Sequence, residues 1–170
     1  MSKINFQKYQ DVIAYLCEKL GGEIQGKKKL AKLLYFADFD FFEKYQRPIT
    51  GDTYRAFPMG PLPLSLDAVT AKMIEDKLLL IEQVDKRPGY HPLNVYKCTV
   101  DCDYSNLDAH ERAMLNRVIA KYGHLNGKQL EDISHMEAPY LGTEAKNDIP
   151  YELAMYRSTD FSDLQPVTAR

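Results

Sequence analysis

The chain has 170 residues, 45% of them hydrophobic and 27% charged, with a formal net charge of −2, so it fits one domain with its own apolar core and is unlike a disordered chain. We find no apolar run long enough to cross a membrane and no signal-peptide pattern, and we therefore expect a cytoplasmic protein with no membrane partner. Its three cysteines, an odd number, fit a reducing compartment and predict no disulfide framework.

The first two predicted elements are helices. Apolar residues recur at three- and four-residue steps over residues 6–20, where Asn5 is the expected N-cap and Gly21-Gly22 the left-handed stop. Residues 27–45, KKKLAKLLYFADFDFFEKY, are apolar around most of the helical surface. A helix with so wide an apolar face is usually central, and we expect this one to form the core of the domain.

The next stretch, RPITGDTYRAFPMGPLP at residues 47–63, contains four of the nine prolines and two of the nine glycines. We predict that Pro48 fixes the exit from the central helix, that Gly51 takes a positive φ, and that Asp52 closes the turn through its side chain. The run TYRAF is typical of a short strand. Pro61, together with Pro63, is predicted to begin the next helix, which continues through about residue 77.

A hairpin and further helices follow. Residues 78–84 and 94–100 are β-like runs joined by DKRPGYHPL, which predicts a hairpin with an exposed loop or wing. Helices are expected over 107–122, with Asp108 and Glu111 forming a capping box, over 128–135, capped by Asn126, and over 150–156. Residues 162–170 are expected to fray. The chain is thus predicted to be an α+β protein, a mostly α-helical single domain (1–157) with a small antiparallel β-sheet or hairpin and a C-terminal tail (158–170).

Patterns that support catalysis or cofactor binding are missing from the sequence. The two glycines of residues 47–63 form no phosphate-binding loop, no nucleophile stands in a recognisable catalytic motif, and the cysteine and histidine spacings match no common zinc site. We therefore expect no catalytic residue, no cofactor and no metal. A hydrolase that uses His124 or His135 with Glu137 remains an alternative, although a histidine at a helix end is more often a cap.

Charge is distributed unevenly along the chain. Residues 1–100 carry 15 Lys and Arg against 12 Asp and Glu, a net charge of +3, whereas residues 101–170 carry 7 against 12, a net charge of −5. The run Lys27-Lys28-Lys29 with Lys32, beside the predicted wing, is typical of a winged-helix DNA-binding protein. Because the basic residues form no continuous stripe, DNA binding is the alternative rather than the main hypothesis.

The run KLLYFADFDFFEKYQRPITGDTYRAFPMGPLP, residues 32–63, resembles the Panacea domain, also called the SocA-like antitoxin domain, of phage- and toxin-associated bacterial proteins. ISHMEAPY at 133–140 and IPYELAMY at 149–156 are also similar to this family. The resemblance implies a non-enzymatic antitoxin that neutralises a toxin by direct protein–protein binding, in some members as an adaptor that presents the toxin to a protease. The expected partner is a cognate toxin, with a protease or chaperone, a second copy of the chain, or DNA as further candidates.

Stiff, aromatic and basic segments lose little entropy when a partner docks, and they supply the side chains typical of interface anchors. A packed edge strand has the same sequence pattern, so both interpretations of residues 54–59 stay open. The residues predicted to bind the partner are Tyr35, Asp38, Arg47, Thr50, Asp52, Tyr54, Arg55 and Met59. Those predicted to form the structural signature are Pro48, Gly51, Gly60 and Pro61.

Overall fold

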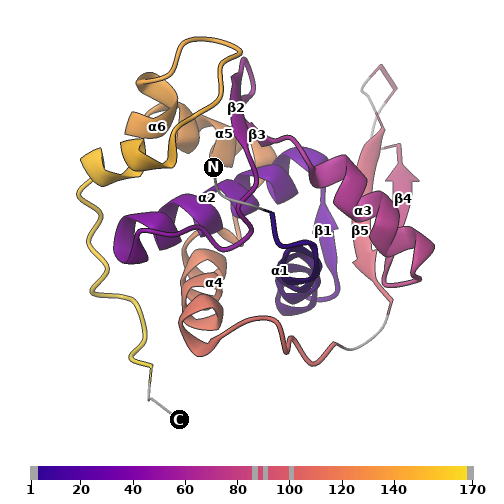
Figure 1. The fold of residues 1–170 in the computed structure, drawn as a ribbon. Coiled ribbons are helices and arrows are strands. Elements are labelled where there is room, and N and C mark those ends of the chain that lie inside the picture. Colours follow the sequence, from indigo (N-terminus) through magenta and orange to yellow (C-terminus); the bar gives the residue numbers. More distant parts are fainter. Residues whose placement is uncertain (1–3, 86–87, 90–91, 100–101, 168–170) are drawn as a thin grey trace.

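The computed structural model describes residues 4–85, 88–89, 92–99 and 102–167. The fold is α+β, mostly helical, with small antiparallel sheets, as the sequence predicts. Figure 1 labels the elements, which in chain order are α1 (Phe6–Lys19), β1 (Glu23–Gln25), α2 (Lys27–Tyr45), β2 (Tyr54–Phe57), β3 (Gly60–Pro63), α3 (Leu66–Glu75), β4 (Leu79–Val84), β5 (Leu93–Cys98), α4 (Ala109–Tyr122), α5 (Gly127–His135), α6 (Ala138–Leu141) and the 3₁₀ helix η1 (Tyr151–Tyr156).

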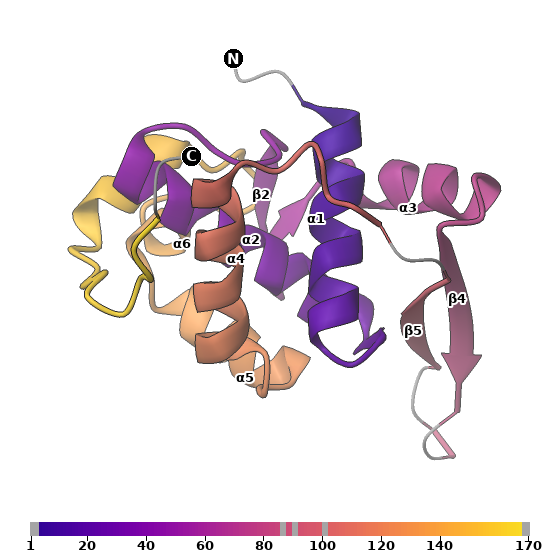
Figure 2. The ribbon, with the colours of Figure 1, turned by 90° about the horizontal axis from the view of Figure 1, so that it is seen from below.

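Helix α2 is the centre of the molecule, which confirms the prediction. All residues from 30 to 41 are buried, including the polar Lys32, Asp38 and Asp40. Helices α1 and α4 lie side by side along one flank of α2, and α5, η1 and strand β3 also contact it (Figures 1 and 2). None of the helices in the described ranges is both long and apolar enough to span a membrane.

The predicted helix caps are present. Asn5 accepts a hydrogen bond from the backbone of Lys8 at the start of α1, and Gly21 and Gly22 after this helix both have positive φ. Asp108 and Glu111 form the reciprocal capping box of α4, and Asn126 caps α5 in the same manner. These polar contacts fix where each helix begins, because they satisfy backbone N–H groups that have no partner within the helix.

The larger sheet has the strand order β1-β5-β4, and all its pairs are antiparallel. The predicted hairpin is confirmed as β4 and β5, whereas β1 was not predicted. Part of the predicted wing, residues 86–87 and 90–91, lies outside the described residues. Strand β1 leads directly into α2, and the N–H of Gly26 donates to the carbonyl of Asn94, which ties the start of α2 to this sheet.

The prediction that Pro61 begins a helix is wrong. Residues 60–63 form strand β3, which pairs with β2 through a two-residue turn, and α3 begins only at Leu66. The carbonyl of Pro61 accepts a hydrogen bond from Lys32 Nζ, which shows that it points away from β2. Backbone groups alternate in direction along a strand, so the nitrogens of Pro61 and Pro63 also point away from β2, and their missing N–H groups cost no ladder bond.

Three features near the C-terminus differ from the prediction or add to it. The helix predicted over residues 150–156 is present as a 3₁₀ helix over 151–156, and the short helix α6 was not predicted. The prediction that the chain frays from residue 162 is wrong for residues 163 and 164. Asp163 pairs with the guanidinium of Arg117, and Leu164 packs on the core. The domain boundary at residue 157 stays a prediction.

Candidate partner-binding surface

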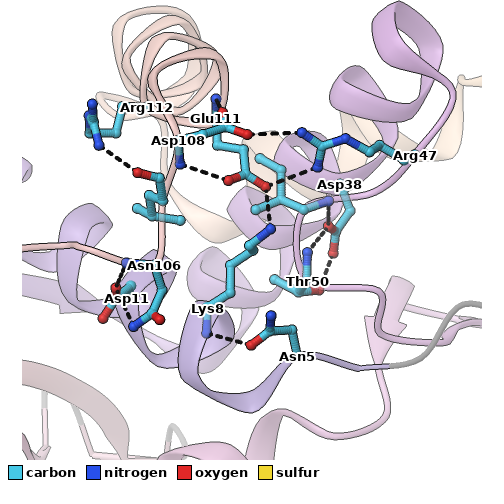
Figure 3. A network of polar contacts seen from close by, with 12 residues as sticks. Asn5, Lys8, Asp11, Asp38, Arg47, Thr50, Asn106, Asp108, Glu111 and Arg112 are labelled. Carbon is cyan, nitrogen blue, oxygen red and sulfur yellow. Dashed lines mark hydrogen bonds and ion pairs between the residues drawn. The ribbon is translucent and has the colours of Figure 1, made fainter. Parts of the chain in front are cut away.

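The loop between α2 and the β2–β3 hairpin is fastened by the buried carboxylate of Asp38. Its Oδ1 accepts hydrogen bonds from the backbone N–H groups of Ile49 (2.8 Å) and Thr50 (2.7 Å), as Figure 3 shows. Its Oδ2 accepts from the hydroxyl groups of Thr50 and Tyr54, the latter at 2.6 Å. Burial raises the pKa of Asp38 to about 6, against the lowering effect of these hydrogen bonds.

A second buried carboxylate, Asp52, closes the same loop. It accepts from the hydroxyl of Tyr9 (2.7 Å) and from the backbone N–H groups of Thr53 (2.7 Å) and Ser65 (3.0 Å). Gly51 beside it has φ +79°, as predicted, a conformation that favours glycine. Asp52 therefore connects helix α1, the start of β2 and the residue before α3.

The edge of β2 that does not pair with β3 is covered by the segment 146–149. The N–H of Ala56 donates to Asn147 (2.9 Å), and the N–H of Ile149 donates to the carbonyl of Tyr54 (2.7 Å). At the tip, the hydroxyl of Tyr140 donates to the carbonyl of Phe57 at 2.7 Å. The hairpin is therefore held along β2 as well as at its base, and its backbone is fixed before any partner arrives.

Burial separates the predicted binding residues into two groups. Five of them are at most 1% exposed and hold the hairpin from inside: Tyr35, Asp38, Thr50, Asp52 and Tyr54. The other three reach the surface: Arg47, Arg55 and Met59. We assign the first group a structural role, because its members hold the hairpin through buried contacts, and we keep the second group as candidates for contact with a partner.

Arg47, which is exposed, and Arg55, which is half-buried, are already paired. Arg47 donates to Glu111 and Asp108 at the start of α4, at 3.2 and 3.0 Å, and Lys8 reaches the same oxygen of Glu111 at 2.8 Å (Figure 3). Arg55 donates to Asp148 at 2.9 Å. Arg47 thus joins the exit of α2 to α4, whereas the pair of Arg55 lies on the surface of the hairpin.

Met59, at the turn of the hairpin, borders a groove of about 500 Å³ between the hairpin and the first turns of α2. We call it the hairpin groove; its lining residues are Lys27, Lys28, Lys32, Phe57, Pro58, Met59, Gly60 and Leu62. Met59 is 54% exposed. The groove was not predicted, because the sequence does not reveal that the basic run of α2 faces the hairpin.

Lys32 is the unusual member of this groove. It is 2% exposed, donates to the carbonyl of Pro61 at 2.9 Å and makes no ion pair within the described part of the chain. Burial lowers the pKa of its ammonium to about 8, although the charge of Glu131 opposes this shift. The hairpin can approach this ammonium because Gly60 has no side chain: a Cβ there would lie 2.7 Å from Lys32 Cε.

A buried ionic cluster under α6 and η1 was missed in the sequence. Arg157 pairs with Asp40 (2.7 Å), Glu43 (2.8 Å) and Glu137 (2.9 Å), and Arg117 pairs with the other oxygen of Asp40 at 2.9 Å. Burial raises the pKa of Asp40, which the two arginines counteract. The position of Asp40 on an apolar helix is the sequence signal that could have indicated such a cluster, because a buried carboxylate needs a partner.

The structure gives little support to the other candidate sites. A second groove, of about 560 Å³, is lined by Lys28, Lys29, Lys128 and His124 among others. The ring of His135 stacks on Tyr140, and among the described residues neither His124 nor His135 hydrogen-bonds a carboxylate. All three cysteines are free, and in the described ranges no group of three or more His, Cys, Asp or Glu side chains is placed to hold a metal ion.

Comparison with known proteins gives one match. A family model described as "Antitoxin SocA-like, Panacea domain" matches residues 30–140, which is more than half of the chain. The match begins in the first turn of α2 and ends within α6, so it contains Asp38 and its hydrogen-bond partners, Asp52, the hairpin and most of the groove. No curated protein and no solved structure matches the chain.

Proposed function

Because the chain belongs to the SocA-like antitoxin family, whose shared unit is the Panacea domain, we propose that it neutralises a toxin protein by binding it directly. The family is usually non-catalytic, so the proposed activity is occupation of a toxin surface rather than a reaction. A toxin partner follows from the family, and the contact surface we propose is the β2–β3 hairpin with its groove.

The observation that carries this surface is the combination of a fixed backbone with exposed apolar side chains. The loop before the hairpin is held by Asp38 and Asp52, and yet Met59 at its tip is 54% exposed. A surface ordered before binding loses less conformational entropy when a partner docks. Methionine and arginine are among the residues enriched in interfaces, which supports Met59 and Arg55 as contacts.

The test is co-expression with the product of the neighbouring gene, read out as growth. We expect that product to arrest growth alone and to become harmless beside this chain. If it is harmless alone, or remains harmful beside this chain, the antitoxin proposal loses its basis. Following the half-life of the tagged toxin in the same cells separates occupation, which leaves its level unchanged, from presentation to a protease, which lowers it.

The contact surface is tested with Arg55→Glu. Its partner Asp148 is 58% exposed, and such surface pairs contribute at most about 1 kcal/mol to folding, so the variant should fold. We expect it to bind the toxin more weakly in a pull-down while its melting temperature stays within a few degrees. Lys121→Glu, an equal charge change at an exposed position of α4, is the matched control and should bind normally. Equal binding by both variants would place the contact surface elsewhere.

DNA binding remains the second candidate. It is favoured by the second groove, where Lys28, Lys29 and Lys128 gather beside strand β5. Against it, twelve successive residues of α2 are buried, so this helix cannot enter a major groove as a recognition helix. A gel-shift titration on the DNA upstream of the gene, at two salt concentrations, tests this candidate. The absence of salt-dependent binding would set it aside.

A further inference from the structure

We propose that the hairpin groove receives a segment of the toxin in which an apolar side chain stands next to a carboxylate. This inference rests on the proposed function and adds the chemistry of the partner. The net charge of −5 over residues 101–170 would suit a basic toxin surface. The hairpin groove requires the opposite charge in the segment that enters it.

The apolar requirement comes from one wall of the groove. Phe57, Pro58, Met59 and Leu62 form this wall. Its volume of about 500 Å³ lies in the usual range for pockets that take small ligands, so it can hold one or two large side chains. Methionine is unbranched and adaptable, which lets Met59 close over side chains of different shape.

The charge requirement comes from the opposite wall. Every charged residue that lines the groove is a lysine: Lys27, Lys28 and Lys32. The ammonium groups of Lys27 and Lys28 already meet Asp67 and Glu131, at 2.8 and 3.0 Å. Lys32 is different, because its single hydrogen bond within the described residues goes to a neutral carbonyl. Glu131 acts on this ammonium only from a distance, without an ion pair between them. A buried ammonium that no carboxylate contacts directly is unfavourable, and a carboxylate from a partner would supply that contact.

This arrangement predicts how binding depends on pH. The charged groups that influence Lys32 are Lys28 on its own helix and Glu131 on α5. A carboxylate in the groove would favour the protonated ammonium and raise its pKa above the value of about 8 in the free protein. Binding then takes up part of a proton near pH 8, so the affinity should fall as the pH rises from 7 to 9.

The first test uses small probes and does not need the toxin. We would titrate 4-phenylbutyrate, 4-phenylbutyramide and 4-phenylbutylamine against the protein and follow its methyl NMR signals. We expect the carboxylate to shift the signals of Met59 and Leu62, the uncharged amide to bind about tenfold more weakly, and the amine to bind most weakly. Equal binding of amine and carboxylate, shifts confined to other methyl groups, or no binding by the carboxylate would overturn the inference.

Lys32→Met is the matching variant, because methionine is apolar, of similar length, and suited to a buried position. We expect it to fold and to bind the carboxylate and the amide equally, with no fall in affinity between pH 7 and 9. Lys72→Met, on the exposed face of α3, is the control and should keep the tenfold preference. A Lys32→Met protein that folds and keeps this preference would contradict the assignment of the charge to Lys32.

A second test uses neutralisation and compares two charges at one exposed position. Met59→Asp should abolish protection from the toxin, whereas Met59→Lys should retain most of it, because only the first repels an acidic segment. Full protection by both variants, or the reverse order, would overturn the inference while the antitoxin proposal stands. If the wild-type chain gives no protection, the proposed function fails, and the probe titration still decides the chemistry of the groove.

Discussion

Replacing Asp38 by alanine removes the acceptor of four buried hydrogen bonds. The donors left behind are the backbone N–H groups of Ile49 and Thr50 and the hydroxyl groups of Thr50 and Tyr54. A buried donor without a partner costs about 1–3 kcal/mol. Taking about 1–1.5 kcal/mol for each donor, because water can enter beside the smaller side chain, we expect a loss of about 4–6 kcal/mol in the free energy of unfolding.

Urea unfolding followed by circular dichroism measures this loss, which is a large part of the total stability of an ordinary domain, about 5–15 kcal/mol. At about 2–4 °C per kcal/mol for a chain of this size, the melting temperature should fall by about 10–20 °C. Asp38→Asn is the matched control: its oxygen can still accept from Ile49 and Thr50, so about half of the loss is expected. If alanine costs less than about 1.5 kcal/mol, Asp38 does not hold the loop as we describe.

The same variant tests the raised pKa. The pKa of Asp38 rises from 3.8 to about 6 on folding, so between these values the folded chain holds a proton that the unfolded chain has released. The corresponding stabilisation, about 3 kcal/mol, is complete below pH 3.8 and is lost as the pH rises through 6. Relative to Asp38→Asn, the wild type should therefore lose stability between pH 4 and pH 7. If the free energies of unfolding of the wild type and of Asp38→Asn changed with pH in parallel, the pKa of Asp38 would not be raised.

Three further substitutions test the backbone and the ionic cluster by urea unfolding. Gln46→Gly should stabilise the fold by about 0.5–1 kcal/mol, because Gln46 ends α2 at φ +61° and glycine relieves the strain; an unchanged midpoint would contradict this. Gly60→Ala should destabilise it by about 2 kcal/mol or more, because φ is +102° and the new Cβ would meet Lys32; a loss under 0.5 kcal/mol would show that the hairpin moves aside. Arg157→Met should cost about 3–5 kcal/mol by leaving Asp40 short of a partner, and a neutral result would mean that Arg117 suffices.

Local patterns predicted most of the helices, because caps and periodicity act over a few residues. Asn5, Asp108 and Asn126 begin their helices as expected. Strand β1 has three residues, too few to show a period, and its pairing with β5 joins segments that lie about seventy residues apart. The helix predicted at Pro61 failed for a related reason: proline suits a first helical turn and an outward-facing strand position equally well, and only the pairing with β2 decides between them.

The candidate site was predictable in its location but not in the orientation of its side chains. The density of proline and glycine at residues 47–63 indicated a fixed backbone, and the contacts of Asp38 and Asp52 account for it. Which side chains face inwards depends on segments from elsewhere in the chain, such as Tyr9 and Tyr151, whose hydroxyl groups reach the side chain and the carbonyl of Asp52. The sequence pattern of an anchor and that of a core aromatic residue are alike, so Tyr54 could not be placed beforehand.

The contacts of α2 and of the loop after it show where this unit can be cut or joined to other proteins. The family match spans residues 30–140, and yet Tyr9 donates to Asp52 from before it, while Arg157 and Thr159 reach Asp40 and Glu43 from beyond it. A fragment cut at the ends of the match would expose the carboxylates of the central helix and part of the apolar core. A truncation, or a fusion that replaces one end of the chain, should therefore leave residues 5–164 in place, whatever the extent of the recognisable motif.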